Sequence, residues 1–187
     1  WEFATAVACH ILGVNAFDQP DVQDAKDRTK AKIAAYKIAG KLDEDKPVKA
    51  ARAKSALNKF LGQVQPGDYV AINAFLPRNP KTAAALTRLR TSIRSKTGVA
   101  TTLGFGPRFL HSTGQLHKGG PDSGIFLLLT SDQTKDVDIP GEGMSFGTLE
   151  RAQALGDAEA LAARGKRLLH IHLSKAADVR LLVEALK

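Results

Sequence analysis

Residues 104–121 read GFGPRFLHSTGQLHKGGP, and this stretch lies between two apolar runs, Val99–Phe105 and Gly124–Thr130. Each run is short and apolar, which is typical of a buried strand. The stretch between them holds five glycines and two of the five histidines of the chain. Glycine lets the backbone approach a ligand closely, so a loop of this composition after a strand is a candidate site in an α/β protein.

Strands and helices alternate on both sides of this stretch. Further strands are predicted at Asp68–Phe75 and Lys166–Leu173, and the LLL run within Gly124–Thr130 predicts burial on both faces of a sheet. Helices are predicted at Asn79–Lys96, Arg108–His117, Gly147–Arg164 and Lys175–Leu186, and residues 131–146 are predicted to form a loop. This order predicts an α/β domain over residues 66–187, a doubly wound parallel sheet in three layers with helices on both faces.

The first 62 residues show no strand pattern. Helices are predicted over Trp1–Gly13, Asp21–Gly40 and Val48–Leu61, with a charged linker at residues 41–49. The chain starts at Trp1 inside a helical pattern and without a methionine. We therefore expect residues 1–62 to be a helical lead-in that packs against another part of a longer polypeptide.

The composition favours a globular protein with a basic surface. Among 187 residues, Lys and Arg number 27 against 19 for Asp and Glu, which gives a net charge of +8. A solvated surface explains this excess, and an anionic substrate is the sharper alternative. No nucleic-acid partner is expected, because no basic run is interleaved with aromatic residues. The single cysteine, Cys9, is expected to be buried in a cytoplasmic protein, and no apolar run is long enough to predict a membrane partner.

The first candidate site is the segment FDQPDVQDAK, residues 17–26. Gln19 can donate hydrogen bonds to sugar hydroxyls and accept them. Lys26, about two turns into the following helix, can hydrogen-bond or protonate a ring oxygen and suits an anionic ligand. By spacing alone, a solvated helix lysine is the more common explanation of Lys26.

The second candidate site is HSTGQLHKGG, residues 111–120. His111 and His117 lie six residues apart without a nearby carboxylate or cysteine, so no metal is expected. Ser112 lacks the pattern of a catalytic triad. An acid–base histidine fits because imidazole titrates near neutral pH, and a helix-end histidine bonded to the backbone is the alternative. His170 and His172 alternate along a strand, so they share a face and are expected to be hydrogen-bonded core residues.

Both segments resemble glucose-6-phosphate isomerases. Trp1-Glu2, Asn15, Phe17-Asp18-Gln19, Val22 and Lys26 match the carboxyl-terminal signature of that family, in which FDQ precedes an active-site lysine. Gln115-Leu116-His117 resembles its QL-x-H-x-G segment, although here the histidine segment follows FDQ. The whole stretch 104–121 is most similar to the bifunctional transaldolase/glucose-6-phosphate isomerases.

The resemblance implies a sugar-isomerase-like fold and a cytoplasmic enzyme of glycolysis and gluconeogenesis that interconverts glucose 6-phosphate and fructose 6-phosphate. It implies no metal and no cofactor, and a parent polypeptide that also carries transaldolase. The implied catalytic residues are Lys26 and His117, which open the sugar ring. The implied substrate-binding residues are Gln19, Gln115, Arg108, His111, Ser112 and Thr113.

The resemblance also implies that other parts complete the site. No carboxylate base and no Ser/Thr phosphate loop occupy a matching motif, so we expect the upstream part of the same polypeptide to supply them. In the family the histidine acts across a subunit interface, which is compatible with a homodimer. A non-catalytic sugar-phosphate-binding domain and a basic nucleic-acid-binding module are the alternatives, and the second would show steep salt dependence.

Overall fold

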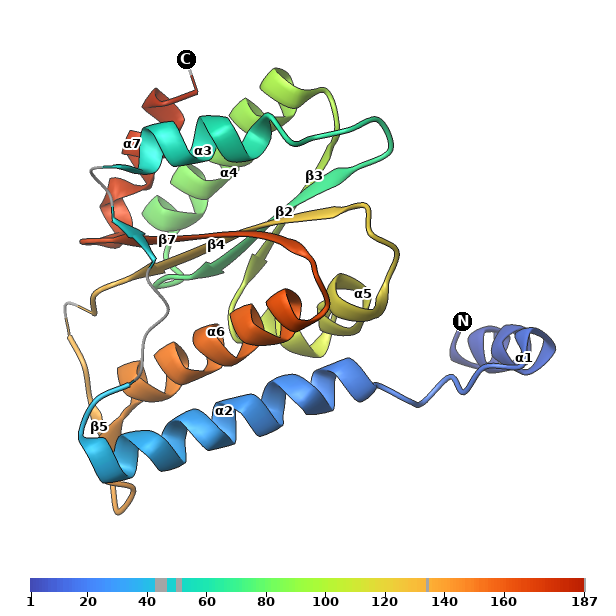
Figure 1. Ribbon diagram of the computed structural model, residues 1–187, viewed down its shortest axis with the longest axis horizontal. Helices are drawn as coiled ribbons and strands as arrows, with labels where there is room; N and C mark the ends of the chain where they lie inside the picture. Colours follow the sequence, from blue (N-terminus) through green and yellow to red (C-terminus); the bar gives the residue numbers. More distant parts are fainter. Residues whose placement is uncertain (43–46, 50–51, 134, 187) are drawn as a thin grey trace.

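The computed structural model describes residues 1–42, 47–49, 52–133 and 135–186. A five-stranded, wholly parallel sheet lies at its centre, with helices on both faces, as the strand–helix alternation predicted (Figure 1). The strand order is β1-β7-β4-β2-β3. The strands are β1 (Val48–Lys49), β2 (Tyr69–Phe75), β3 (Ala100–Phe105), β4 (Gly124–Ser131) and β7 (Arg167–Leu173).

Helices form a layer on each face of this sheet (Figure 1). One layer contains α3 (Ala53–Leu61), α4 (Pro80–Thr97), the short 3-10 helix η3 (Ala176–Asp178) and α7 (Val179–Glu184). The other contains η2 (Arg108–His111), α5 (Gly114–Gly119) and α6 (Phe146–Ala163). The long helix α2 (Pro20–Ala39) runs along the outer side of α6, and α1 (Glu2–Leu12) lies apart from the sheet (Figure 1).

The core follows from the alternation of side chains along the strands. On the central strand β4, Ile125, Leu127 and Leu129 join the core under α3, α4 and α7, whereas Phe126 and Leu128 face α6. Every residue of β4 is buried, which confirms the prediction from its LLL run. On α4, Leu86, Leu89 and Ile93 share one face and are fully buried.

The helix predicted over Val48–Leu61 is confirmed for Ala53–Leu61 and wrong at its start. Val48–Lys49 forms an edge strand in place of the predicted start of a helix, and Val48 lies opposite Ile171 of β7. Helix α3 then begins at Ala53, and its Leu57 and Phe60 belong to the main core. Residues 50–51, and residues 43–46 of the predicted linker, lie outside the described residues.

Helix α2 packs on α6 of the same chain. A Cβ atom added at Gly156 of α6 would lie 3.1 Å from the backbone oxygen of Ala25 and 3.0 Å from the backbone nitrogen of Thr29. Real Cβ contacts are rarely this short, so the two helices approach closely because position 156 carries no side chain. Lys32 of α2 forms an ion pair with Glu159 of α6 at the same contact.

Two further predictions, one of a helix and one of a loop, differ from the structure. The helix predicted over Arg108–His117 is divided into η2 and α5, because the hydroxyl groups of Ser112 and Thr113 bond to the carbonyl of Phe109 and interrupt the helix. The predicted loop at residues 131–146 contains a small antiparallel ladder of β5 (Asp138–Ile139) and β6 (Met144–Ser145).

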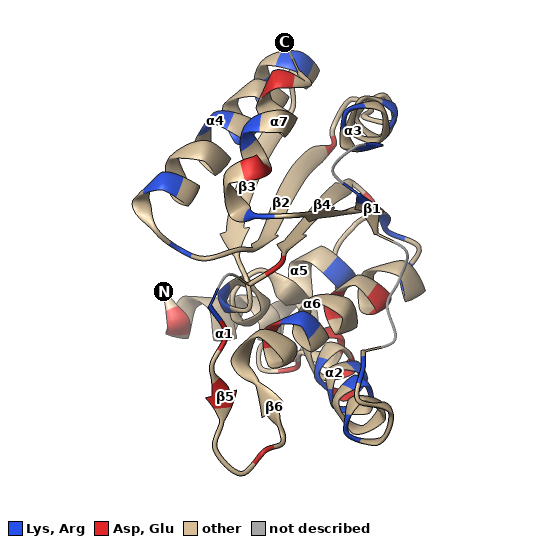
Figure 2. Ribbon diagram, turned by 90° about the vertical axis from the view of Figure 1, so that its left-hand side faces the viewer, with Lys and Arg blue, Asp and Glu red and all other residues tan. Residues whose placement is uncertain are grey.

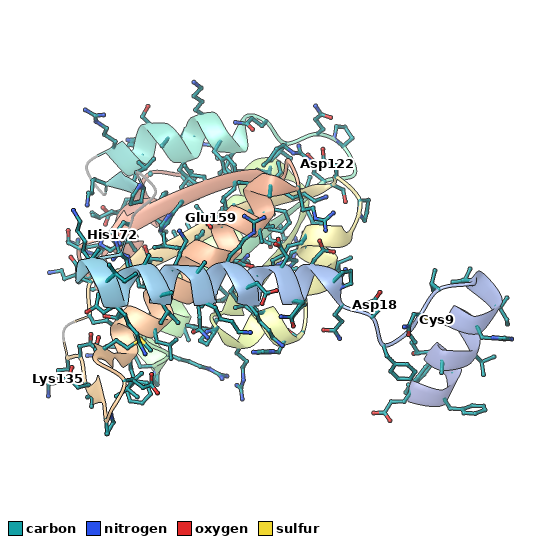
Figure 3. All side chains as sticks on the ribbon, turned by 60° about the horizontal axis from the view of Figure 1, so that its bottom comes forward. Cys9, Asp18, Asp122, Lys135, Glu159 and His172 are labelled. Carbon is teal, nitrogen blue, oxygen red and sulfur yellow. The ribbon has the colours of Figure 1, made fainter. Side chains whose placement is uncertain are left out.

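Helix α1 contains no buried residue, although apolar residues recur along one of its faces. Phe3 and Ile11 on that face are exposed to solvent. Cys9 is half-buried, so the expectation that it is buried is wrong (Figure 3).

Among the described helices, none is both long enough and apolar enough to cross a membrane. Figure 2 shows Lys and Arg spread over helices of both layers, which fits the interpretation of the charge as a solvated surface.

Candidate functional site

The two segments that resemble the isomerase family meet in the structure, although they lie 94 residues apart in the chain. The backbone N–H of Asp21 donates to Gln115 Oε1 at 3.1 Å, and Gln115 Nε2 donates to Asp21 Oδ2 at 2.6 Å. Arg164, directly after the end of α6, approaches the other carboxylate oxygen of Asp21 at 2.6 Å. Gln115 therefore fastens the amino-terminal end of α2 to α5, and its side chain is engaged in that task rather than aimed at a substrate.

Lys26 and His111 line one pocket of about 160 Å³ between α2, η2, α5 and α6. Lys118 of α5 and Gln153 of α6 also line it. The lining carries two lysines and a histidine, and no carboxylate is found among the described residues that line it. Lys118 is paired with Asp157 behind the lining, so Lys26 is the lysine of this pocket that can attract an anionic group.

Lys118, the lysine of α5 that lines the pocket, forms a buried ion pair and a backbone hydrogen bond. Lys118 Nζ lies 2.6 Å from Asp157 Oδ1, and both side chains are only 1% exposed. Lys118 Nζ also donates to the carbonyl of Gly114 at 3.3 Å. Burial raises the pKa of Asp157, and the neighbouring ammonium group of Lys118 opposes this rise.

His117 lies apart from the pocket that Lys26 lines. Its ring packs among those of Phe126, Phe109 and Tyr69, with centroid separations of 5.1, 6.0 and 6.5 Å. Burial, reinforced by the charge of Lys118, lowers the pKa of His117 to about 4. The imidazole of His117 is therefore neutral at neutral pH. His111, not His117, lines the pocket together with Lys26. The catalytic role of His117 stays a prediction.

The other predicted binding residues lie outside this pocket. Arg108, Ser112 and Thr113 are exposed, and the two hydroxyl groups bond to the carbonyl of Phe109. Gln19 is exposed at the start of α2 and makes no side-chain capping bond there. Their contact with a substrate stays a prediction, and it would need a ligand that extends beyond the pocket.

Sequence reasoning missed Lys118 and Asp157. Lys118 lies next to His117 in the segment 111–120, but only the histidines of that segment were considered as acid–base groups. Asp157 is an acidic residue inside the apolar stretch ALGDAEAL of a predicted helix. A charged residue at a position that the helical period places inward signals a buried partner, and this signal was available in the sequence.

His170 and His172 share a face of β7 and are hydrogen-bonded, as predicted. Thr130 Oγ1 lies 2.8 Å from His170 Nε2 and 2.9 Å from His172 Nδ1. His172 Nε2 lies 3.0 Å from Asp132 Oδ1. Within the described residues, no group of three or more His, Cys, Asp or Glu side chains could hold a metal ion.

No protein-family model matches the sequence, and no curated protein is similar to it. The fold is similar to the crystal structure of a hypothetical protein, TT0462, from Thermus thermophilus, with a TM-score of 0.55 and 16% sequence identity. The similarity covers 73% of this chain and 36% of that protein, so the chain spans about a third of its length. At this identity the likeness concerns the fold alone.

Proposed function

We propose that the chain is the carboxyl-terminal part of an isomerase that interconverts glucose 6-phosphate and fructose 6-phosphate. Lys26 and residues of the segment 104–121 line one pocket whose described lining holds no carboxylate, and this observation carries the proposal. The resemblance linked these segments through a sugar phosphate substrate, and their contact across 94 residues supports that link. The ammonium group of Lys26 suits the anionic substrate that the resemblance implies.

Ring opening is the step that these residues can perform. The bond between C1 and the ring oxygen breaks as the ring oxygen gains a proton and the C1 hydroxyl loses one, which leaves a carbonyl at C1. Lys26 is the proton donor to the ring oxygen in this proposal, and the imidazole of His111 accepts the proton of the C1 hydroxyl. The same pocket lacks a carboxylate among its described lining, so the base that removes the C2 proton comes from elsewhere.

The size of the pocket supports a site that another segment completes. Its volume of about 160 Å³ is below the range of roughly 300–1,000 Å³ that small-molecule sites usually occupy. The proposal assigns the missing wall and the base to the upstream part of the same polypeptide or to a second subunit of a homodimer. It requires no metal and no cofactor.

The decisive experiment compares two lysines of α2 in the parent polypeptide. Lys26→Ala should lower kcat/KM for glucose 6-phosphate by about 10²–10⁴-fold, the usual cost of losing one acid–base group. Lys30→Ala is the matched control, since the Lys30 side chain is 75% exposed and does not line the pocket. Equal losses in the two variants, or none in either, would contradict the proposal.

A second experiment separates ring opening from proton transfer. Exchange of the C2 proton of an acyclic substrate analogue, measured by deuterium uptake from solvent, bypasses the ring. Lys26→Ala and His111→Ala should reduce this exchange much less than they reduce turnover of glucose 6-phosphate. His117→Ala belongs in the same series and tests the alternative that the resemblance implies. Similar losses on cyclic and acyclic substrates would assign the residues to another step.

The absence of a carboxylate from the described lining favours one alternative, a sugar-phosphate-binding domain without catalysis. Such a domain would bind glucose 6-phosphate in the pocket beside Lys26 and His111. It would promote no exchange of the C2 proton even within the parent polypeptide. The deuterium measurement therefore distinguishes the two functions.

A further inference from the structure

A second cavity, of about 360 Å³, opens at the carboxyl ends of β2 and β4. Phe75 at the end of β2, and Thr130 and Ser131 at the end of β4, line it. These strands are neighbours, but β2 leads into α4 on one face of the sheet and β4 leads toward α6 on the other. The cavity therefore lies at the point where the connections reverse, which is where open α/β sheets bind ligands. None of the residues predicted from the sequence as site residues lines it.

A chain of hydrogen bonds fixes Asp132 at this cavity. The ionised carboxylate of Asp132 only accepts hydrogen bonds, so His172 Nε2 carries the hydrogen and donates it. In the neutral ring, His172 Nδ1 then accepts from the hydroxyl of Thr130, which in turn accepts from His170 Nε2. Burial lowers the pKa of His170 to about 4, so that ring is neutral at neutral pH.

The side chain of Asp132, which these hydrogen bonds orient, is accessible to a ligand. The Asp132 side chain is 69% exposed, whereas that of His172 is 6% exposed. Asp132 Oδ2 has no hydrogen-bond partner among the described residues. With Oδ1 bonded to His172 and the side chain exposed to solvent, Oδ2 of Asp132 can accept a hydrogen bond from a bound molecule.

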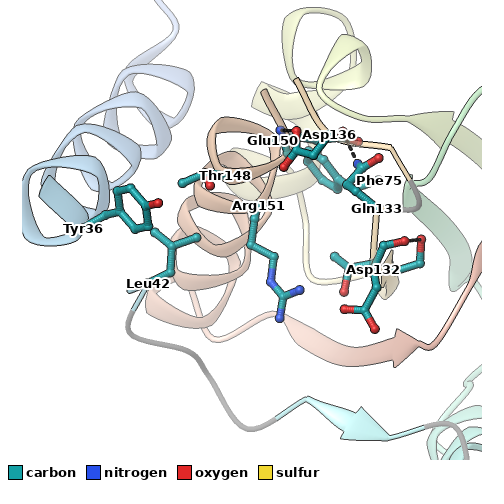
Figure 4. Close-up of a pocket in the computed structure, with 12 residues that line it drawn as sticks. Tyr36, Leu42, Phe75, Asp132, Gln133, Asp136, Thr148, Glu150 and Arg151 are labelled. Carbon is teal, nitrogen blue, oxygen red and sulfur yellow. Dashed lines mark hydrogen bonds between the residues drawn. The ribbon is translucent and has the colours of Figure 1, made fainter. Parts of the chain in front are cut away.

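Charges of both signs line the cavity. Asp132, Asp136 and Glu150 contribute carboxylates, and Arg151 contributes a guanidinium group that extends between Tyr36 and Asp132 in Figure 4. The three carboxylates disfavour an anionic ligand, and the guanidinium group of Arg151 among them disfavours a cationic one. These surroundings favour a polar ligand without a net charge.

The remaining lining suits hydroxyl groups. Gln133 Nε2 donates to Glu150 Oε2 at 3.0 Å, which leaves the amide oxygen of Gln133 and its second N–H for a ligand. Tyr36 lines the side opposite Gln133 and offers an aromatic ring (Figure 4). We propose that the cavity binds a neutral monosaccharide, with Asp132 and Gln133 bonding to its hydroxyl groups and Tyr36 packing against its C–H face.

The test is a titration of the isotopically labelled chain with D-glucose, followed by amide resonances in NMR spectra. Amides of Ser131, Asp132 and Thr148 should shift saturably, and those of Lys26 and His111 should not. Asp132→Asn keeps the shape of the side chain but loses its charge, and it should weaken binding about tenfold, since hydrogen bonds to charged groups are stronger. Asp138→Asn is the matched control, because Asp138 is an exposed carboxylate of β5 outside the cavity.

Three outcomes would overturn the proposal: no saturable shift up to high millimolar glucose, equal binding by Asp132→Asn and the wild type, or tighter binding of glucose 6-phosphate than of glucose at these amides. The last outcome would assign the cavity to an anionic ligand. The proposed isomerase function is measured at different residues, around Lys26, so failure of one proposal is distinguishable from failure of the other.

Discussion

At the scale of single residues, the pair Lys118–Asp157 is the most deeply buried ion pair among the described residues. Both groups are almost fully removed from water, and their separation is 2.6 Å. Their attraction offsets the cost of desolvation only while both are present. Removing one partner leaves the other charge buried without compensation.

The first prediction is that Asp157→Ala lowers the free energy of unfolding by about 3–5 kcal/mol, the usual cost of breaking a buried ion pair. The double variant Lys118→Met with Asp157→Leu should recover most of this loss, because it removes both charges and fills the space with apolar atoms. Denaturant unfolding followed by circular dichroism measures both effects. If the double variant is as unstable as the single one, the loss comes from packing rather than from an unpaired charge.

At the scale of elements, α2 is attached to the rest of the chain by few apolar contacts. Its only buried residues in the described chain are Asp21, Val22 and Ala25. The close approach of α2 to Gly156, the ion pair between Lys32 and Glu159, and the bonds around Asp21 supply the remaining attachment. Lys26 depends on this attachment for its place in the pocket.

The second prediction concerns Gly156→Ala. Alanine is the better helix former by about 1 kcal/mol, but its Cβ would collide with the backbone of α2 at Ala25 and Thr29. Because backbone atoms cannot rotate away, we expect a net destabilisation and a displacement of α2. Amide hydrogen exchange should become faster in α2 and stay unchanged in β2 and β4. A more stable protein with an unchanged α2 would show that helix propensity outweighs the contact.

The four main strands were predictable because each is a short apolar run bounded by polar or glycine residues. The structure places their ends within one residue of the prediction at β2, β3, β4 and β7. Strand β1 was not predictable in this way. Two residues carry no periodicity, and the partner of Val48 is Ile171, near the other end of the chain. Its conformation is set by tertiary pairing rather than by local propensity.

The candidate site was predictable in its segments but not in its geometry. Residues of the glycine-rich stretch and of the segment 17–26 both line the pocket, and their role in binding stays a prediction. Which histidine stands beside Lys26 depends on where the helix after β3 breaks, and that break is set by two hydroxyl groups bonding to Phe109. A regular helix over Arg108–His117 would have given a different relation between the two imidazoles.

At the scale of the whole molecule, two buried histidines couple stability to pH. Burial lowers the pKa of His117 and of His170 from 6.5 to about 4. The unfolded chain therefore binds more protons than the native protein between these limits, so the free energy of unfolding falls as the pH falls from about 6.5 to about 4. Burial raises the pKa of Glu150 and of Asp157, which acts in the opposite direction in the acid range.

The third prediction isolates one of these contributions. His117→Phe replaces the imidazole with a ring that suits its aromatic neighbours and cannot be protonated. Relative to the wild type, the variant should gain about 2 kcal/mol in the free energy of unfolding when the pH falls from about 7 to about 5. His10→Gln is the control, since His10 is exposed on α1. A difference between His117→Phe and the wild type that does not vary with pH would show that His117 is accessible to protons in the native state.

The pairing of β1 with β7 also bears on the order in which the chain folds. Closing a loop that spans most of the molecule is entropically costly, so contacts between elements near in sequence, such as β2 with α4 and β3, are expected to form earlier. The segment first in the sequence would then be among the last to dock. Helix α2, which precedes β1, would detach in partial unfolding while the sheet persists. Lys26 would thus sit on the part of the native structure that opens most readily, and a ligand held there would slow the opening of that helix before it affected any strand.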